Sequence, residues 1–274
     1  MFLKVYIPHP ALQEFVVSLQ AIDVPLEGTD EIVNPYPPSP HQSILFYGEH
    51  PIKMQKEGWD HFELQPSIVV VGPMYTRVNL IVMKRLKCVR VDFHPCGLYR
   101  LLGIPMIHLF DGGGNALDII GNEMQIVNQQ ILEAPDVDTS KTIVENFLLQ
   151  KLKQLKTTLP IDFALRELLR NDGNVSIEKI ASIACLSLRQ FERKCSERLG
   201  IPPKVFARVA RFSKAYRLRE AQPELTWTAI AHEAGYFDQM HMIRDFKEFA
   251  GVTPKIIEEA LSATPFRMQA DLVV

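Results

Sequence analysis

Two segments near the C-terminal end of the chain repeat one pattern, and this repeat constrains the fold more than any other feature. The first copy runs from Ile180 to Lys204 and the second from Ile230 to Lys255. Each copy contains a short apolar-periodic stretch, a turn, a longer amphipathic stretch and a closing glycine, which is the pattern of two helices joined by a turn. Two such units in tandem predict an all-helical domain that places two helices into DNA.

The first unit divides its residues between a packing face and an outward face. Ser176 and Ser187 are expected to cap its two helices, because a serine hydroxyl accepts a hydrogen bond from an otherwise unpaired amide. Helical spacing predicts that Phe191, Cys195 and Leu199 face the core. The opposite face carries Arg189, Glu192, Arg193 and Ser196. Glu192 either accepts from a cytosine amino group or pairs with a neighbouring arginine.

The second unit repeats this division with one more residue in its turn. Asp238 is the expected cap, with Met242, Phe246 and Phe249 inward. Arg244 is equivalent to Arg193, and arginine bonds guanine with two parallel donors, as glutamine does adenine. Ile243 is expected to face outward, where it either contacts a thymine methyl group or packs against another helix. The predicted base-contacting residues are Arg189, Glu192, Arg193, Gln239, Met240, Ile243 and Arg244.

Charge is concentrated in one segment of an otherwise acidic chain. The net charge is -2, but residues 185–219 hold ten Lys/Arg and two Glu, so this segment carries 10 - 2 = +8 and the rest -10. Such a stripe favours a polyanionic partner over an ordinary solvated face. A helix over Lys204–Glu220 would set the distance between the two units. The predicted phosphate contacts are Ser187, Lys194, Lys204, Arg208, Arg211 and Asp238.

The N-terminal part has the composition of strands followed by helices. Short β-branched runs separated by turn formers such as Gly48 predict a small barrel or sandwich, with strands at 43–47, 67–71, 78–82 and 88–93. The proline-rich run from Asn34 to Pro40 is expected to be irregular. Helices are predicted at 97–102, 117–132 and 140–155. The last two expose apolar faces that serve either a dimer or packing within the monomer.

The second unit resembles the AraC/XylS family of transcription regulators. The resemblance rests on Gly235-Tyr236-Phe237-Asp238-Gln239, followed by Phe246-Lys247 and Gly251-Val252-Thr253-Pro254, and it covers about residues 160–260. It implies that the outward residues of both longer helices contact bases and that RNA polymerase is a partner. Cys185, Met240 and His241 depart from the family pattern, since small or polar residues are usual at these positions.

The N-terminal residues resemble the divergent cupin-like sensor domains of that family. The resemblance rests on Pro8–Leu12, Val71-Gly72-Pro73 and Val91–Gly97. It implies a small-molecule effector and leaves a homodimer open. The expected fold is α+β with two domains, a cupin-like barrel or sandwich with flanking helices over 1–156 and a tandem helix-turn-helix domain over 160–262. Tyr36, Phe46, Tyr75 and Phe93 are the expected ligand-lining residues.

Other functions have weaker support in the sequence. A metal-dependent cupin enzyme with an accessory helical domain is the main alternative, but its histidines are scattered without a His-x-His cluster, so we expect no metal, cofactor or catalytic residue. A helical scaffold for other proteins leaves the basic stripe without a role. The four cysteines form no Cys-x-x-Cys pair and fit free thiols in the cytoplasm. No signal peptide or membrane span is expected.

Overall fold

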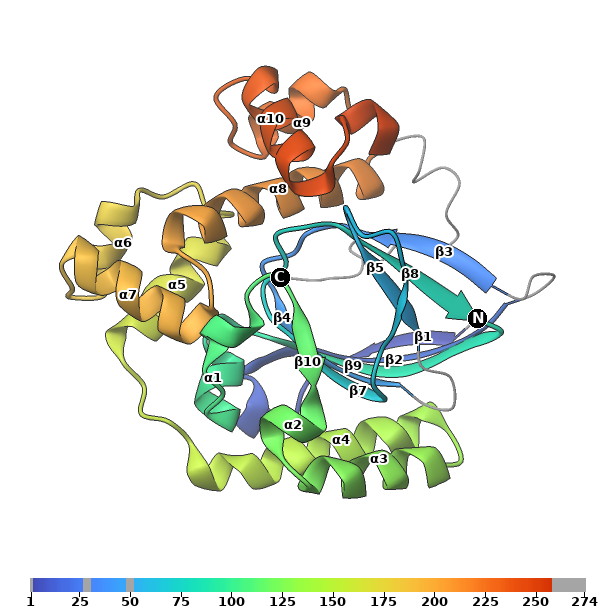
Figure 1. Ribbon diagram of the computed structural model, residues 1–274. Coiled ribbons are helices and arrows are strands. Elements are labelled where there is room, and N and C mark those ends of the chain that lie inside the picture. Colours follow the sequence, from blue (N-terminus) through green and yellow to red (C-terminus); the bar gives the residue numbers. More distant parts are fainter. Residues whose placement is uncertain (1, 27–30, 48–51, 258–274) are drawn as a thin grey trace.

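The computed structural model describes residues 2–26, 31–47 and 52–257 of the chain (Figure 1). Two β-sheets form the N-terminal part, and a group of helices forms the C-terminal part. Gly48 and residues 258–262, to which two sequence predictions refer, lie outside the described residues. No helix of the described ranges is both long and apolar enough to cross a membrane.

The two sheets are antiparallel in every pairing that the described strands make. The larger sheet has the order β1-β2-β9-β4-β7-β10, and the smaller sheet β3-β8-β5-β6. No ladder joins the sheets among the described strands, so the predicted alternative of a sandwich is confirmed and a closed barrel is not formed. The strands are β1 Phe2–Tyr6, β2 Val16–Pro25, β3 Glu31–Tyr36, β4 Gln42–Tyr47, β5 Lys53–Lys56, β6 Glu63–Leu64, β7 Ile68–Val71, β8 Val78–Met83, β9 Arg85–Phe93 and β10 Gly113–Asn115.

The four strands predicted from the sequence are confirmed as β4, β7, β8 and β9, whereas the proline-rich prediction was partly wrong. Asn34, Pro35 and Tyr36 belong to β3 and pair with β8. Because β3 is an edge strand, it has one side without a ladder, and an edge accommodates a residue that lacks an N–H group. Strands β1 and β2 were not predicted at all.

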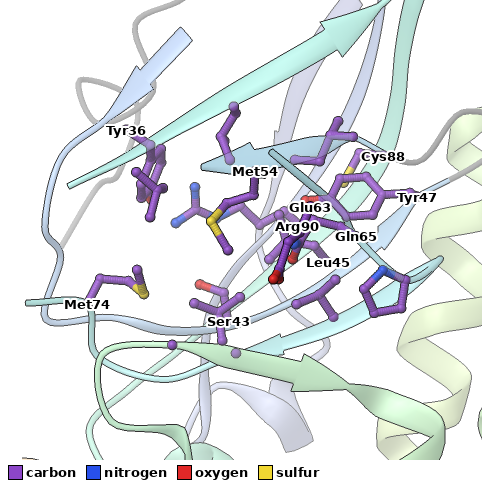
Figure 2. Close-up of a pocket in the computed structure, with 18 of the residues that line it drawn as sticks. Tyr36, Ser43, Leu45, Tyr47, Met54, Glu63, Gln65, Met74, Cys88 and Arg90 are labelled. Carbon is purple, nitrogen blue, oxygen red and sulfur yellow. The ribbon is translucent and has the colours of Figure 1, made fainter. Parts of the chain in front are cut away.

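Alternation along the strands sends successive side chains to opposite faces of the larger sheet. Ile44 and Phe46 of β4, with Val91 and Phe93 of β9, pack against the helices below that sheet. Ser43, Leu45 and Arg90 point the other way, into the space between the sheets (Figure 2).

Helices cover the outer face of the larger sheet (Figure 1). The helix predicted over 117–132 is in fact two, since Gly121 ends the first and Asn122 precedes the second. The helix predicted over 140–155 starts earlier, because the Asp136 side chain accepts from the Thr139 amide. The helices and 3-10 turns here are η1 Pro10–Leu12, α1 Gly97–Leu102, η2 Met106–Leu109, α2 Ala116–Ile120, α3 Glu123–Glu133, α4 Val137–Lys151 and η3 Leu152–Gln154.

The described residues of the C-terminal part form helices joined by loops, and they have their own apolar cluster, which contains five buried phenylalanines. Phe191, Phe206, Phe212, Phe246 and Phe249 are fully buried. The helices are α5 Pro160–Arg170, α6 Ile177–Ile183, α7 Leu188–Leu199, α8 Pro203–Ala221, α9 Trp227–Glu233 and α10 Gln239–Ala250. The two predicted helix-turn-helix units are therefore confirmed as α6–α7 and α9–α10.

The predicted caps are confirmed. Ser176 accepts from the Lys179 amide, Ser187 from the Gln190 amide and Asp238 from the His241 amide. The two turns differ in length by one residue, as predicted, and also in the residue that takes the left-handed conformation. Both need a left-handed residue, which is Gly235 in the second unit (φ +86°) but Cys185 in the first (φ +55°). An L-residue adopts this conformation at a cost that glycine avoids.

Each longer helix also touches the N-terminal part near its C-terminal end. Gly200, which ends α7, lies so close to η2 that an added Cβ would stand 2.3 Å from the Met106 carbonyl oxygen. Near the end of α10, the Phe249 carbonyl accepts from the Arg77 amide at 3.1 Å, and its ring meets the Tyr75 ring edge-on.

Candidate nucleic-acid interface and ligand cavity

Helix α8 separates the two helix-turn-helix units. Figure 1 shows α6 and α7 at one end of α8 and α9 and α10 at the other. Its 19 residues span about 28 Å at 1.5 Å per residue, which is comparable to the roughly 34 Å between successive major grooves on one face of DNA. The fold thus holds α7 and α10 apart on a scale that suits a duplex.

The outward residues predicted for base contact all keep accessible surface. Arg189, Arg193, Met240 and Arg244 are exposed, and Glu192, Gln239 and Ile243 are half-buried. The residues predicted to face inward are buried as expected, namely Phe191, Cys195, Leu199, Met242, Phe246 and Phe249. The division between a packing face and a polar face is therefore present in both units.

The charged groups on the outward faces are available for a partner. Among the described residues, no ion pair involves Arg189, Arg193 or Arg244. The predicted pairing of Glu192 with a neighbouring arginine is also not formed there. Gln239 differs, because its side-chain oxygen accepts from the Thr228 hydroxyl at 2.9 Å.

The basic side of α8 is largely neutralised within the protein, which the charge count did not predict. Arg208 donates to Asp245 through Nε at 3.2 Å and Nη2 at 2.7 Å, and it also binds Glu248. These carboxylates lie on α10, so Arg208 fastens α8 to the second reading helix. Its predicted role as a phosphate contact would require this arrangement to open.

Other basic residues of the stripe have similar internal partners. Arg211 donates to the Asn174 side chain at 2.9 Å and the Gly173 carbonyl at 3.1 Å. Lys214 and Arg217 share Asp172, and Arg198 pairs with Asp162. Lys194 and Lys204, in contrast, make no ion pair with any described residue. Sequence spacing cannot reveal this difference, because the partners lie far away in the chain, on α5, on α10 and in the loop between α5 and α6.

One exposed residue of the second unit was missed by the sequence analysis. Phe237 is 94% exposed and immediately precedes the cap of α10. Met240, also exposed, lies on the first turn of that helix. The signal in the sequence was an aromatic residue directly before the cap Asp238, at a position that the apolar periodicity of α10 does not use.

A cavity of about 370 Å³ lies between the two sheets (Figure 2). Of the four predicted ligand-lining residues, only Tyr36 lines it. Phe46 and Phe93 belong to the apolar cluster on the outer face of the larger sheet, because strand alternation turns them away. Tyr75 instead contacts α10. The lining is mostly aliphatic, with Leu45, Met54, Val69, Leu80 and Val82 among its members.

Polar side chains also line this cavity, among them Lys56, Glu63 and Gln65. Arg90, Ser43 and His41 are buried in its wall. Burial lowers the pKa of His41 to about 4, so the ring is neutral at pH 7. Neither ring nitrogen of His41 has a hydrogen-bond partner among the described residues. Across the part of the chain that the structure describes, no group of three or more His, Cys, Asp or Glu is placed to hold a metal ion.

Comparison with known protein families gives two matches. Residues 180–259 match a helix-turn-helix domain, and residues 4–113 match a domain of unknown function. None of the curated proteins compared matches the chain.

Comparison with solved structures gives matches to ToxT and to AdpA. ToxT from Vibrio cholerae bound to (E)-4-(8-methylnaphthalen-1-yl)but-3-enoic acid has 13% identity and a TM-score of 0.47, over 89% of this chain and 99% of that chain. Wild-type ToxT bound to an unsaturated fatty acid has 14% identity and a TM-score of 0.44, over 89% and 100%. The DNA-binding domain of the global transcriptional factor AdpA, in complex with a target DNA, has 21% identity and a TM-score of 0.37, over 39% and 96%.

The match, the two capped units and the Gly235–Pro254 signature concern the same part of the chain. The C-terminal part of this protein contains a tandem helix-turn-helix domain, joined on one chain to a region that matches a domain of unknown function.

Proposed function

We propose that this protein is a sequence-specific DNA-binding regulator of transcription whose N-terminal part responds to a small molecule. The observation that carries this proposal is the pair of reading helices, α7 and α10. Each presents an arginine, Arg193 or Arg244, that is exposed and has no ion-pair partner among the described residues. Arginine in a major groove donates two parallel hydrogen bonds to guanine.

The proposed contacts follow from the surfaces of the two helices. Arg189, Glu192 and Arg193 would read bases in one groove, and Gln239, Met240, Ile243 and Arg244 would read bases in the next. Lys194 and Lys204 are the best placed for phosphate oxygens, since no described residue neutralises them. Ser187 and Asp238 cap the two helices and would leave nearby amides facing the backbone.

The remaining parts are assigned by the same proposal. Residues 1–156 would form the sensing and dimerising domain, and residues 160–262 the DNA-binding domain. Helix α3 exposes Ile126 and Leu132, which fits a homodimer contact. RNA polymerase would be the partner in transcription, and the cytoplasm the place of action.

Binding to promoter fragments at several salt concentrations tests the proposal. Each phosphate neutralised should steepen the log-log dependence of affinity on salt by about 0.9. Arg193→Ala and Arg244→Ala should each cost about 1–3 kcal/mol and relax preference at one base position. Arg85→Ala is the control, because Arg85 lies on β9 and pairs with Asp23, away from both reading helices. Salt-independent binding, or none to any promoter fragment, would refute the proposal.

The enzyme alternative has a direct test. A metal-dependent enzyme should purify with stoichiometric iron, zinc or manganese, and metal analysis of the full chain measures this. Our proposal is that the protein is not an enzyme, and it expects substoichiometric metal together with specific DNA binding.

A further inference from the structure

A second cavity lies between the N-terminal part and the helices of the C-terminal part, apart from the space between the two sheets. It is an open cleft of about 640 Å³, a size that suits a small organic ligand. His94 and Pro95, which follow β9, form one side, and residues of α5, of the loop after α5 and of α8 form the other. We call this cavity the basic cleft, because most of its charged side chains are cationic.

The lining of the basic cleft carries an excess of positive charge. Arg166 and Arg170 of α5 and Lys214 and Arg217 of α8 face the single carboxylate of the lining, that of Asp172, so the formal charge is 4 - 1 = +3. Burial, then Arg166 and Arg170, lowers the pKa of His94 to about 4, which shows that the charge of both arginines reaches its ring. Cations gathered in a partly buried cleft repel one another, and a bound anion would relieve this repulsion.

Asp172 is shared between two of these cations and compensates neither fully. Its Oδ2 lies 3.1 Å from Nζ of Lys214, and its Oδ1 lies 3.5 Å from Nη2 of Arg217. Both distances exceed the usual length of a charge-assisted hydrogen bond, about 2.7–2.9 Å. Nη1 of Arg217 donates to the neutral hydroxyl of Ser213 at 3.2 Å. These side chains are therefore held in place and still have donors to offer.

The two arginines of α5 have less compensation still. Nη2 of Arg166 lies 3.7 Å from Glu14, a carboxylate that Arg100 already binds. Nε of Arg166 is buried and has no hydrogen-bond partner among the described residues. Arg170 is exposed and makes no ion pair with any described residue. Because four positions separate them, Arg166 and Arg170 lie on one face of α5.

The number of cations selects the class of anion. Arginine and lysine only donate, and the parallel N–H groups of arginine match phosphate oxygens. A monocarboxylate would leave most of the excess charge in place. A single phosphate group carries about -1.5 to -2 at pH 7, and a diphosphate carries more, which matches the excess better. Leu169, Leu218 and Pro95 in the same lining offer apolar surface to the rest of a ligand.

We propose that the basic cleft binds a small molecule with a diphosphate group, of the size of a nucleoside diphosphate, which Arg166, Arg170, Lys214 and Arg217 contact. This site goes beyond the regulator function proposed above, because it is separate from the cavity between the sheets and from the outward faces of α7 and α10. A ligand there would join the loop after β9 to α5 and α8.

Calorimetric titration of the full chain at constant ionic strength tests this. The probes are pyrophosphate, ADP and adenosine, and the last keeps the base and sugar of ADP but lacks its charge. We expect pyrophosphate and ADP to bind, and ADP to bind about tenfold or more tightly than adenosine, because charge-assisted bonds exceed neutral ones. Equal affinities for ADP and adenosine, or no binding of either phosphate compound, would overturn the proposal.

Two variants in the cleft should change the affinity for ADP in opposite directions. Arg170→Gln removes an exposed cation that holds no described residue in place, and it should weaken ADP binding about tenfold. Asp172→Asn removes the competing carboxylate, and asparagine tolerates the left-handed backbone of this position (φ +50°). It should tighten ADP binding about threefold or more, which a damaged fold could not do. Unchanged or weaker binding by Asp172→Asn would overturn the proposal. Arg85→Gln, outside the cleft and paired with Asp23, is the matched control and should leave ADP affinity unchanged.

The DNA backbone is the other source of phosphate, and a DNA titration distinguishes it. Arg170→Gln should leave the affinity for a promoter fragment unchanged, whereas Lys204→Gln, on α8 but outside the cleft, should weaken DNA binding and preserve ADP binding. Displacement of ADP by DNA, with both affinities reduced alike by Arg170→Gln, would assign the cleft to the duplex and overturn the proposal. ADP binding without any DNA binding would refute the regulator function alone.

Discussion

Individual side chains of this protein carry charge in two distinct settings, exposed on the reading helices or held by partners inside the fold. Arg193 and Arg208 illustrate the contrast. Both belong to the basic stripe, yet Arg193 is exposed on α7 while Arg208 binds Asp245 and Glu248 of α10. Removing an arginine is therefore expected to affect DNA affinity alone at Arg193, but both DNA affinity and protein stability at Arg208.

Replacing Arg208 by alanine should lower stability as well as DNA affinity. The change would leave Asp245, which is almost fully buried, without its cationic partner. Because Arg208 itself is partly exposed, we expect a loss of about 1 kcal/mol, seen as a lower midpoint in urea. Arg193→Ala should leave the midpoint unchanged. Equal midpoints for the two variants would contradict the structural role of Arg208.

His41 should make stability depend on pH. Its pKa is lowered to about 4 by burial, with the charges of Asp92, Arg217, Arg90 and His94 also acting on it. Since the unfolded ring titrates near 6.5, the unfolded state binds more protons between these values. Stability is then full above about pH 6.5 and is lost as pH falls toward 4, by about 2 kcal/mol between pH 7 and pH 5.

Urea unfolding at several pH values measures this slope, and His41→Asn should flatten it. His94 contributes in the same direction, because burial, then Arg166 and Arg170, lower its pKa to about 4. The variant should therefore retain a smaller slope. An unchanged slope would show that His41 does not titrate as inferred.

Helices and strands were predictable where local chemistry sets them. Helix starts were predictable from the capping residues Ser176, Ser187 and Asp238. The ends of the two longer helices were predictable from the glycines that follow them, so both helix-turn-helix units could be predicted from the sequence. Strand β1 was missed because FLKVY has weak alternation and gains its place by pairing with β2. The prediction of which residues line the cavity was wrong for Phe46 and Phe93, because composition does not show which face of a strand a phenylalanine occupies. Arg90 was missed because one arginine in an apolar run carries no motif.

The end of α7 offers a test of how an element is anchored. Gly200 has φ +82° and lies against the Met106 backbone, so Gly200→Ala adds both strain and a clash. Gly58 has φ +89° with nothing within 4 Å of its added Cβ, so Gly58→Ala adds strain alone. We expect the first change to cost at least about 2 kcal/mol and the second about 1 kcal/mol. Thermal unfolding compares them, and equal losses would mean that α7 is not tightly packed on η2.

At the scale of the whole molecule, the N-terminal part touches both reading helices through different residues. Tyr75 bonds Glu248 and packs on Phe249 of α10. Tyr99 bonds Glu197 of α7 at 3.2 Å and lies under Arg198. The distance between the helices is thus set by α8 and by two separate attachments.

Hydrogen exchange of the full chain should resolve these attachments. Tyr75→Ala should speed exchange in α10 and leave α7 unchanged, because it removes a contact to α10 alone. Tyr99→Ala should have the opposite effect, so each variant is the control for the other. Uniform acceleration of both helices by either variant would show that they move as one unit.

The two attachments differ in the region of the N-terminal part to which each one belongs. Met74, in the cavity wall, is the neighbour of Tyr75 in the chain, whereas η2 belongs to the cluster on the outer side of the larger sheet. The attachment to α10 therefore lies next in the chain to a residue of the cavity wall, whereas the attachment to α7 belongs to the apolar cluster of the larger sheet. If the proposed effector fills this cavity, we expect α10 to shift before α7, which would change the contacts with one half of a DNA site while the other half stays bound.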